Sequence, residues 1–366
     1  MFTSLFTLGL ALTGVSVFAT PLKRADSFTV SLSGPAASVT SLDELKFTAS
    51  ITNAGAETVK ILKYGTILDG DLPTRSFTIT KDGSTVPFTG IKLTVSLTDL
   101  DDSAFATIGA GETITVDHDV SSLFDFASAG EGTYTFEPVT TFQMADVAAK
   151  LVASTLEKVT VSSTSVDVHI SGDLAARDVA GIDKRATPVC SDSTKKAFIT
   201  SRLAIFACLY SEAKTLASLS SSYISSNGKN SLYTAYWGAT ATSTISGVYN
   251  SVASESSSSR TLSCTDAYGA CTSGVIAYTV ISTTNIYYCS LFFNEVASSN
   301  LCTGTTVAAR NIRGGTTLHE LTHAVADTDD VTYGCSADQA LSDANAKINA
   351  DNYNCFATQV YQNTQC

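Results

Sequence analysis

The cysteines divide this chain of 366 residues into two unlike parts. No cysteine occurs up to Arg185, and all nine follow it: Cys190, Cys208, Cys264, Cys271, Cys289, Cys302, Cys335, Cys355 and Cys366. In an exported chain this density predicts disulfide bonds and an oxidising compartment. A zinc–thiolate site is the rival interpretation, but the sequence has no Cys-x-x-Cys pair to support it. Spacing alone does not assign the pairs.

Residues 1–19 indicate that the chain is exported. They form an apolar run ending in Val17-Phe18-Ala19, the small-residue pattern of a signal-peptidase site. The run is too short to predict a membrane span, and no later stretch offers about 20 uninterrupted apolar residues. We therefore expect a signal peptide over residues 1–19 and a secreted, extracellular protein that is not anchored in a membrane.

Short strands are predicted between Asp26 and Ile170. Polar and apolar residues alternate in five segments, which are residues 27–32, 46–51, 76–80, 91–95 and 159–161. Turn-forming residues such as Asp82-Gly83 lie between them. Period-two strands with turns at this spacing predict an all-β sandwich of immunoglobulin-like type.

The pair Lys184-Arg185 predicts a processing site. A dibasic pair in a polar stretch of an exported precursor is typical of cleavage by a kexin-type protease, which makes residues 20–185 a removable pro-segment that holds the β-sandwich. Lys23-Arg24 is a second candidate pair. The alternative for either pair is two ordinary basic surface residues. Residues 186–366 would then form the mature domain.

The sequence of the second half predicts mixed secondary structure that is mostly helical. Residues 195–219 and the surroundings of residues 233–237 predict helices, and residues 275–280 and 286–293 predict the strands of a small hairpin. Residues 337–360 again look helical. We expect an α+β domain in which an extended substrate could pair with the edge of a strand.

The stretch Leu318-His319-Glu320-Leu321-Thr322-His323 carries the chemistry. Positions four apart on a helix lie on the same face, so His319 and His323 can bind one metal ion while Glu320 points toward the same space. Thr316 or Thr317 could cap a helix that starts just before His319. A catalytic zinc usually has three protein ligands and one open position. The other two histidines are far upstream, so a carboxylate from the acidic run that follows is the expected third ligand: Asp327, Asp329 or Asp330.

A lone His-Glu-x-x-His occurs in many unrelated helices, and an acidic run is often only a solvated turn. Together, in this order, these residues resemble the deuterolysins, or fungal neutral protease II, in the aspzincin group of zinc endopeptidases. Their pattern continues as Gly-Thr-x-Asp-x-x-Tyr-Gly, and here it reads Asp327-Thr328-Asp329-Asp330-Val331-Thr332-Tyr333-Gly334. Asp327 stands where the family has Gly, and Tyr333-Gly334 sets the register.

The resemblance implies a zincin-type metalloprotease domain over residues 186–366. It implies one Zn²⁺ per chain held by His319, His323 and Asp330, with Glu320 as general base and Tyr333 as donor to the oxyanion. It also implies three disulfides, which are Cys190–Cys264, Cys271–Cys289 and Cys302–Cys366. Cys335–Cys355 is a plausible fourth pair, which leaves Cys208 as a free thiol.

The expected function is a secreted zinc-dependent endopeptidase, made as a zymogen, that acts as a monomer on proteins and peptides. After Arg185 the chain has 9 Lys and Arg against 12 Asp and Glu, and no basic patch predicts binding of nucleic acid. A cleft rimmed by Asp327, Asp329 and Asp338 would favour basic protein substrates, as the family's liking for histones and protamines suggests. The alternative is a non-catalytic secreted binding or adhesion protein with a structural zinc.

The zymogen must be kept inactive without a cysteine, because the pro-segment has none that could bind the zinc as a thiolate. The pro-segment would have to block the cleft sterically, assist folding, or both. His118 or His169 as an inhibitory ligand is a further alternative.

Overall fold

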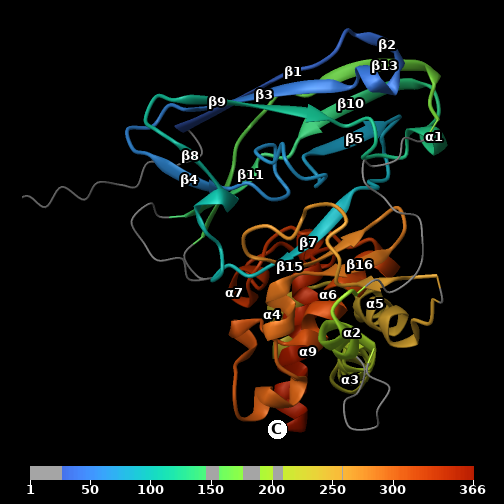
Figure 1. Ribbon diagram of the computed structural model, residues 1–366. Helices are drawn as coiled ribbons and strands as arrows, with labels where there is room; N and C mark the ends of the chain where they lie inside the picture. The colour runs from blue at the N-terminus through green and yellow to red at the C-terminus, as the bar shows by residue number, and fades with distance from the viewer. Residues whose placement is uncertain (1–26, 146–155, 176–189, 201–208, 258) are drawn as a thin grey trace, which may run out of the picture.

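The structure is a computed structural model that describes residues 27–145, 156–175, 190–200, 209–257 and 259–366. The first half of the chain forms β-sheets and the second half a mainly helical body, with one above the other in Figure 1. This combination agrees with the prediction of a β-rich part followed by an α+β part. The predicted signal peptide, the two dibasic pairs and Cys208 lie outside the described residues. Among the helices of the described part, none is long and apolar enough to cross a bilayer.

Three sheets in the first half enclose one hydrophobic core, with strand orders β1-β3-β9, β2-β13-β10-β5-β6 and β12-β11-β4-β8. In β3, Phe47, Ala49 and Ile51 are buried, because alternate side chains of a strand point to the same face. The strands are β1 (Phe28–Ser33), β2 (Ser38–Ser41), β3 (Lys46–Asn53), β4 (Val59–Leu62), β5 (Phe77–Lys81), β6 (Ser84–Thr85), β8 (Phe105–Ile108), β9 (Thr113–Asp119), β10 (Gly132–Pro138), β11 (Thr141–Ala145), β12 (Glu157–Thr160) and β13 (Val166–Asp173), with the short helix α1 (Phe126–Ala129) before β10.

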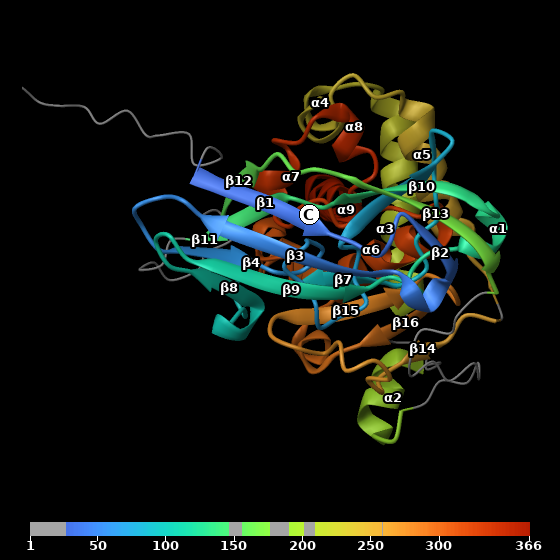
Figure 2. The same ribbon diagram turned by 90° about the horizontal axis from the view of Figure 1, so that it is seen from above.

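Helix α6 (Arg313–Ala326) lies at the centre of the second half, packed against α3, α9 and β15 (Figure 1). Seen from above, the strands of the first half lie across these helices (Figure 2). The remaining elements are α2 (Ser193–Thr200), α3 (Leu209–Asn227), α4 (Ser231–Trp237), α5 (Thr242–Ser254), α7 (Cys335–Asp338), α8 (Asp343–Ala346), α9 (Ala350–Gln365), β14 (Leu262–Ser263), β15 (Val275–Val280) and β16 (Asn285–Tyr288).

Three local predictions are corrected. The strand expected over residues 286–293 ends at Tyr288, after which residues 290–294 form a 3-10 helix. The helix expected over residues 337–360 is three helices, α7, α8 and α9, separated where Ser342 caps α8 and where Asn349 precedes α9. Neither Thr316 nor Thr317 caps a helix, because α6 already begins at Arg313 and both threonines are buried within it.

The strand predicted over residues 91–95 is present as β7 (Ile91–Val95), but it does not belong to the three sheets of the first half. It pairs antiparallel with β15 and completes a sheet of order β14-β16-β15-β7 in the second half of the molecule. All five of its residues are buried, whereas β3 in the first half buries only alternate positions. Its period-two pattern predicted a strand correctly, but both of its faces are covered by residues that lie far away in sequence.

The apolar side chains of β7 bind the two halves together. Leu93 and Val95 share a hydrophobic cluster with Phe105 from β8 and with Tyr278 and Tyr333 from the second half. Figure 1 shows β7 at the junction, between the sheets of the first half above and α6 below. The first half therefore contributes a strand to the sheet that covers the helix carrying the His-Glu-x-x-His motif.

Candidate metal centre and its covering strand

Helix α6 positions His319, Glu320 and His323, and all three side chains are buried. The helix can pack this closely because its first turn contains Gly314 and Gly315. A Cβ atom at Gly315 would lie 2.3 Å from Asn354 Oδ1, and one at Gly314 would lie 2.8 Å from the Cβ atom of Glu212. The glycine pair thus permits close approach to α9 and α3 rather than forming a turn before the helix.

The end of α6 brings the acidic run back toward the histidines. Asp327 ends the helix in the left-handed conformation, with φ of 50°, and its N–H donates to the His323 carbonyl at 3.1 Å. Aspartate tolerates this conformation better than most residues. The chain can therefore reverse within three residues, and Asp330 lies beside both imidazoles.

His319, His323 and Asp330 form a group that could hold one metal ion, with one potential ligand atom from each within 4.8 Å of the others. Asp330 Oδ1 lies 3.0 Å from His319 Nε2 and 3.2 Å from His323 Nε2. Two imidazoles and one carboxylate are a donor set that suits catalytic zinc. Of the three carboxylates that the sequence left open, Asp330 is the one at the histidines.

The hydrogen bonds around the histidines leave ligand atoms free for a metal. His323 Nδ1 lies 2.6 Å from the Thr328 carbonyl, which can only accept, so Nδ1 carries the hydrogen. His323 Nε2 is buried and lies 3.2 Å from Asp330 Oδ1, with no further hydrogen bond among the described residues. An Nδ1–H bonded to a carbonyl fixes the ring and the tautomer that a metal-binding Nε2 requires. These residues fit a zinc ion.

The electrostatics of the site also favour a cation. Burial alone would lower the pKa of His319, but the carboxylates of Asp330 and Asp351 outweigh it and raise that pKa to about 10. Burial would raise the pKa of Asp330, but His323 and His319 hold it below its ordinary value. Positive charge is therefore stabilised between these three side chains, as a divalent metal ion requires.

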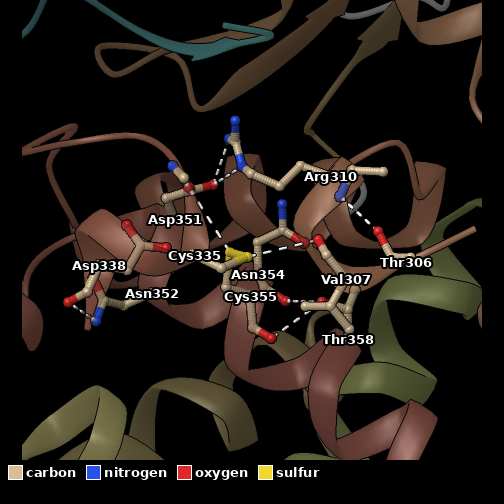
Figure 3. Close-up of a disulfide and its surroundings, with 12 residues drawn as sticks. Thr306, Val307, Arg310, Cys335, Asp338, Asp351, Asn352, Asn354, Cys355 and Thr358 are labelled. Carbon is tan, nitrogen blue, oxygen red and sulfur yellow. Dashed lines mark hydrogen bonds and ion pairs between the residues drawn. A yellow bond between two sulfur atoms is a disulfide. The ribbon is translucent and has the colours of Figure 1, made fainter. Parts of the chain in front are cut away.

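A supporting layer that sequence reasoning missed lies behind His319. Asp351 Oδ1 is 3.6 Å from His319 Nδ1, and the same carboxylate accepts hydrogen bonds from Arg310 Nε at 3.0 Å and from the Gly334 N–H at 2.7 Å. Figure 3 shows Arg310 and Asp351 next to the Cys335–Cys355 disulfide. Carboxylates in this position orient metal-binding histidines. No spacing rule in the sequence identified Asp351 or Arg310, which come from separate segments.

Asp338 does not rim the cleft, contrary to the sequence interpretation. Its side chain is fully buried, accepts from Asn349 Nδ2 at 3.0 Å, and has a pKa raised well above its ordinary value by burial and by Asp351. Asp338 also lies near Cys335 and Cys355 in a second group of potential metal ligands, but those two cysteines are joined in a disulfide. Asp338 is therefore part of the interior.

Strand β7 occupies the space above the metal ligands. The Leu93 N–H donates to Asp330 Oδ2 at 2.8 Å, and the Leu93 carbonyl accepts from the Tyr333 hydroxyl at 3.0 Å. Thr94 Oγ1 donates to Glu320 Oε1 at 2.5 Å, and Thr279 donates to the other carboxylate oxygen at 2.5 Å. Burial raises the pKa of Glu320. The groups expected to act on a peptide are thus all engaged by a strand from the first half.

Lys92 of β7 is held by the turn that follows α6. Its ammonium nitrogen lies 2.6 Å from Asp327 Oδ1, 2.8 Å from the Thr328 carbonyl and 3.0 Å from Asp329 Oδ1, and its side chain is only 4% exposed. Arg75 donates to Asp329 Oδ2 at 2.6 Å. Two carboxylates that the sequence offered as zinc ligands therefore bind basic side chains of the first half instead.

The other sequence candidates are placed as follows. His118 is buried in the first half, 3.0 Å from the Ile67 carbonyl, and His169 lies on β13 opposite Thr133, so neither joins the group of His319, His323 and Asp330. Lys184 and Arg185 lie outside the described residues. The structure contains the four disulfides Cys190–Cys264, Cys271–Cys289, Cys302–Cys366 and Cys335–Cys355.

Comparison with known proteins adds a family. The model of the deuterolysin metalloprotease (M35) family matches residues 1–366. A neutral protease 2 homolog of Sclerotinia sclerotiorum is 33% identical, covering 86% of each chain, and one of Phaeosphaeria nodorum is 34% identical, covering 88% of this chain and 90% of its own. A peptidyl-Lys metalloendopeptidase of Armillaria mellea is 30% identical over 96% of each chain. Among solved structures, a CARDB domain from Pyrococcus furiosus matches with 11% identity over 40% of this chain and 96% of its own, at a TM-score of 0.18, which is too low to inform the fold.

Proposed function

Because the chain belongs to the deuterolysin family of zinc metalloendopeptidases, we propose that it is a secreted endopeptidase that is made as a zymogen and hydrolyses proteins with one zinc ion. The observation that carries the proposal is the convergence of His319, His323 and Asp330 beside Glu320, under a strand of the first half. Those three side chains would hold the metal.

The bound zinc would supply Lewis acidity, which lowers the pKa of water and polarises a peptide carbonyl. Glu320 would take a proton from the attacking water at a carboxylate oxygen and deliver it to the leaving amine. Its buried position and raised pKa suit a group that must both accept and release a proton. Thr279 would orient this carboxylate, since its hydroxyl bonds Oε2.

Tyr333 would stabilise the negative charge that develops on the carbonyl oxygen. Its hydroxyl donates to the Leu93 carbonyl, so it already faces a peptide oxygen in this structure. Burial raises its pKa well above the ordinary value, which keeps the phenol protonated as a donor. The guanidinium carbon of Arg310 lies 5.7 Å from the centre of the Tyr333 ring.

Latency would arise because β7 occupies the place of the substrate. The strand takes the edge of β15, and its Leu93 and Thr94 use the hydrogen-bonding groups of Asp330, Tyr333 and Glu320. A substrate could reach these groups only after β7 leaves. Cutting the chain after Arg185 would not by itself remove a strand about 90 residues upstream, so activation would also require dissociation of the pro-segment.

The finer assignments remain part of the proposal. They are a signal peptide over residues 1–19, a pro-segment over residues 20–185 with an immunoglobulin-like sandwich, a kexin-type cut after Lys184-Arg185, and a monomeric zincin-type domain over residues 186–366. A preference for basic proteins is supported by Asp327 and Asp329, which bind Lys92 and Arg75. A non-catalytic protein with a structural zinc has less support, because Glu320 lies beside a group of three potential ligands, with no fourth in that group among the described residues.

The test uses the full chain expressed in a secreting host. We expect protein from the medium to begin at Ala186, to contain about one zinc per chain, and to hydrolyse casein until a chelator is added. A start near Thr20 would indicate a permanent β-domain. Protein that binds no zinc, or that binds zinc without any chelator-sensitive hydrolysis, would overturn the proposed activity.

A further inference from the structure

We infer that Asp327, Asp329 and the Thr328 carbonyl form a subsite for a lysine side chain of the substrate, at the second residue before the hydrolysed bond. The inference deepens the proposed function and rests on it, because it uses the role of Tyr333 as donor to the attacked carbonyl. Lys92 of the pro-segment occupies this subsite in the precursor.

Strand β7 lies along β15 as an extended substrate would. It pairs antiparallel with β15, where Lys92, Leu93 and Thr94 lie opposite Thr279, Tyr278 and Ala277. Extended peptides bind sheet edges in this way, with backbone hydrogen bonds that are independent of sequence and with alternate side chains in pockets. The Leu93 backbone is held at both of its polar atoms by Asp330 and Tyr333.

Two side-chain contacts set the register of β7 relative to the catalytic groups. Tyr333 donates to the Leu93 carbonyl, and the next side chain, Thr94, is bonded to Glu320. The Leu93–Thr94 peptide bond therefore lies where the hydrolysed bond of a substrate would lie. Lys92 is then the second residue on the amino-terminal side of that bond, and its side chain enters the turn that follows α6.

The oxygens of the subsite suit an ammonium group. An ammonium group has three N–H donors, and the three nearest oxygens lie 2.6, 2.8 and 3.0 Å from the Lys92 nitrogen, with the Asp327 carbonyl farther away at 3.3 Å. Two of these oxygens belong to carboxylates, and the lysine stem is almost completely buried. A compact ammonium suits this arrangement, whereas the planar guanidinium of arginine presents a wider fork.

The subsite belongs to the mature domain, and the backbone of that domain holds it in place. All three acceptors follow Arg185 in the sequence. Asp327 is fixed by the end of α6, and Asp329 by backbone hydrogen bonds of 2.6 Å to the Ile348 carbonyl and 2.9 Å from the Ala350 N–H. The acceptors should therefore keep their positions when Lys92 leaves, and a preformed site binds its ligand with less ordering cost.

The surroundings agree with a cleft that accepts basic groups. A cavity of about 330 Å³ adjoins the subsite, lined by Asp329 and Asp330 from the second half and by Arg75, Lys92 and Lys158 from the first. The pro-segment thus covers an acidic part of the cleft with cations. A basic substrate would meet the same acidic surface once the pro-segment has gone.

The test measures kcat/KM of the processed enzyme, obtained by secretion of the full chain, on peptides that differ only at the second residue before the cleaved bond. Lysine, norleucine and glutamine are compared there, and the cut is located by mass spectrometry. We expect lysine to exceed both neutral residues by roughly tenfold, which corresponds to about 1.4 kcal/mol. This comparison uses the unmodified enzyme and does not depend on the folding of a variant.

Variants then assign the preference to the two carboxylates. Asp327→Asn and Asp329→Asn should each lower the ratio of lysine to norleucine peptides severalfold. Asp192→Asn is the matched control, since Asp192 is exposed and bonds only the start of α2, and it should leave the ratio unchanged.

The outcomes separate the two proposals. If no peptide is hydrolysed and no zinc is bound, the proposed function fails. If peptides are hydrolysed with equal kcat/KM whatever stands at this position, or if lysine is preferred only at another position, the peptidase stands and the subsite is wrong. Lys92 would then serve only to fasten the pro-segment.

Discussion

Replacing Lys92 by methionine should partly activate the precursor, because it weakens the binding of β7 in the cleft. Methionine keeps much of the length and the apolar character of the lysine stem but removes its charge. The change is made in a full chain that cannot be processed, with Lys184→Ala and Arg185→Ala, so that β7 remains covalently attached to the catalytic part. Activity in this background reports the fraction of molecules in which β7 has left the cleft.

The magnitude follows from the burial of the three groups. Lys92 is 4% exposed, whereas the side chains of Asp327 and Asp329 are 67% and 23% exposed. Removing one partner of a fully buried ion pair costs about 3–5 kcal/mol, and an exposed pair contributes about 0–1 kcal/mol. Asp329 also keeps its bond to Arg75 at 2.6 Å. We therefore expect closure to weaken by about 2 kcal/mol, or roughly 30-fold in the open fraction.

The assay is hydrolysis of a fluorogenic peptide with a neutral residue at the proposed lysine subsite, so that loss of latency is not confused with altered substrate binding. Lys92→Met should raise residual activity roughly 30-fold over the unprocessed parent. Lys46→Met is the control, because Lys46 is an exposed lysine at the start of β3 and lies outside the apolar cluster around Leu93, so the change should have no effect. Equal residual activity in the folded Lys92→Met and parent chains would refute the idea that this ion pair holds β7 in the cleft.

Three further predictions concern the site and its support. Glu320→Gln should keep its zinc but lose nearly all turnover, at least about 10²-fold, and peptidase assays beside metal analysis would contradict the proton-transfer role if activity stayed near normal. Asp330→Ala should lose zinc, and an unchanged metal content would move the third ligand elsewhere. Glu295 is buried with its pKa raised to about 8, so its neutral form stabilises the fold fully below about pH 4.5, and this stability is lost as pH rises through 8. Denaturant titrations should show that Glu295→Gln removes a fall on the order of 3 kcal/mol between pH 5 and 9; parallel pH profiles for variant and parent would count against it.

Local chemistry was readable from the sequence where it depends on near neighbours. His319 and His323 share a helix face because they are four residues apart, and β3 and β7 are strands because polar and apolar residues alternate in them. The family was also identified from the motif, and the family comparison confirms it. The start of α6 was placed too late, because Thr316 or Thr317 was predicted to cap the helix, whereas α6 begins at Arg313 and both threonines are buried within it.

Other parts of the site depend on contacts between distant segments. Asp351 supports His319 from α9, and Asp338, which was expected on the rim of the cleft, is buried because α7 packs inward beside α9. A carboxylate in the sequence carries no mark of whether it will face solvent or a buried partner. Whether a carboxylate is buried, and which group it bonds, is determined only when the helices pack.

The amino-acid sequence was enough to predict a helix with His319 and His323 on one face, disulfides confined to the second half and a strand at residues 91–95. The folded structure was needed to see that this strand pairs with β15 rather than with the sheets of the first half, and that it places Thr94 against Glu320, 226 positions later in the chain. Periodicity fixes how side chains point from their own backbone, but it does not specify the partner of a strand. That choice follows from complementary groups far away in sequence, here the carboxylates that receive Lys92 and the apolar cluster around Leu93.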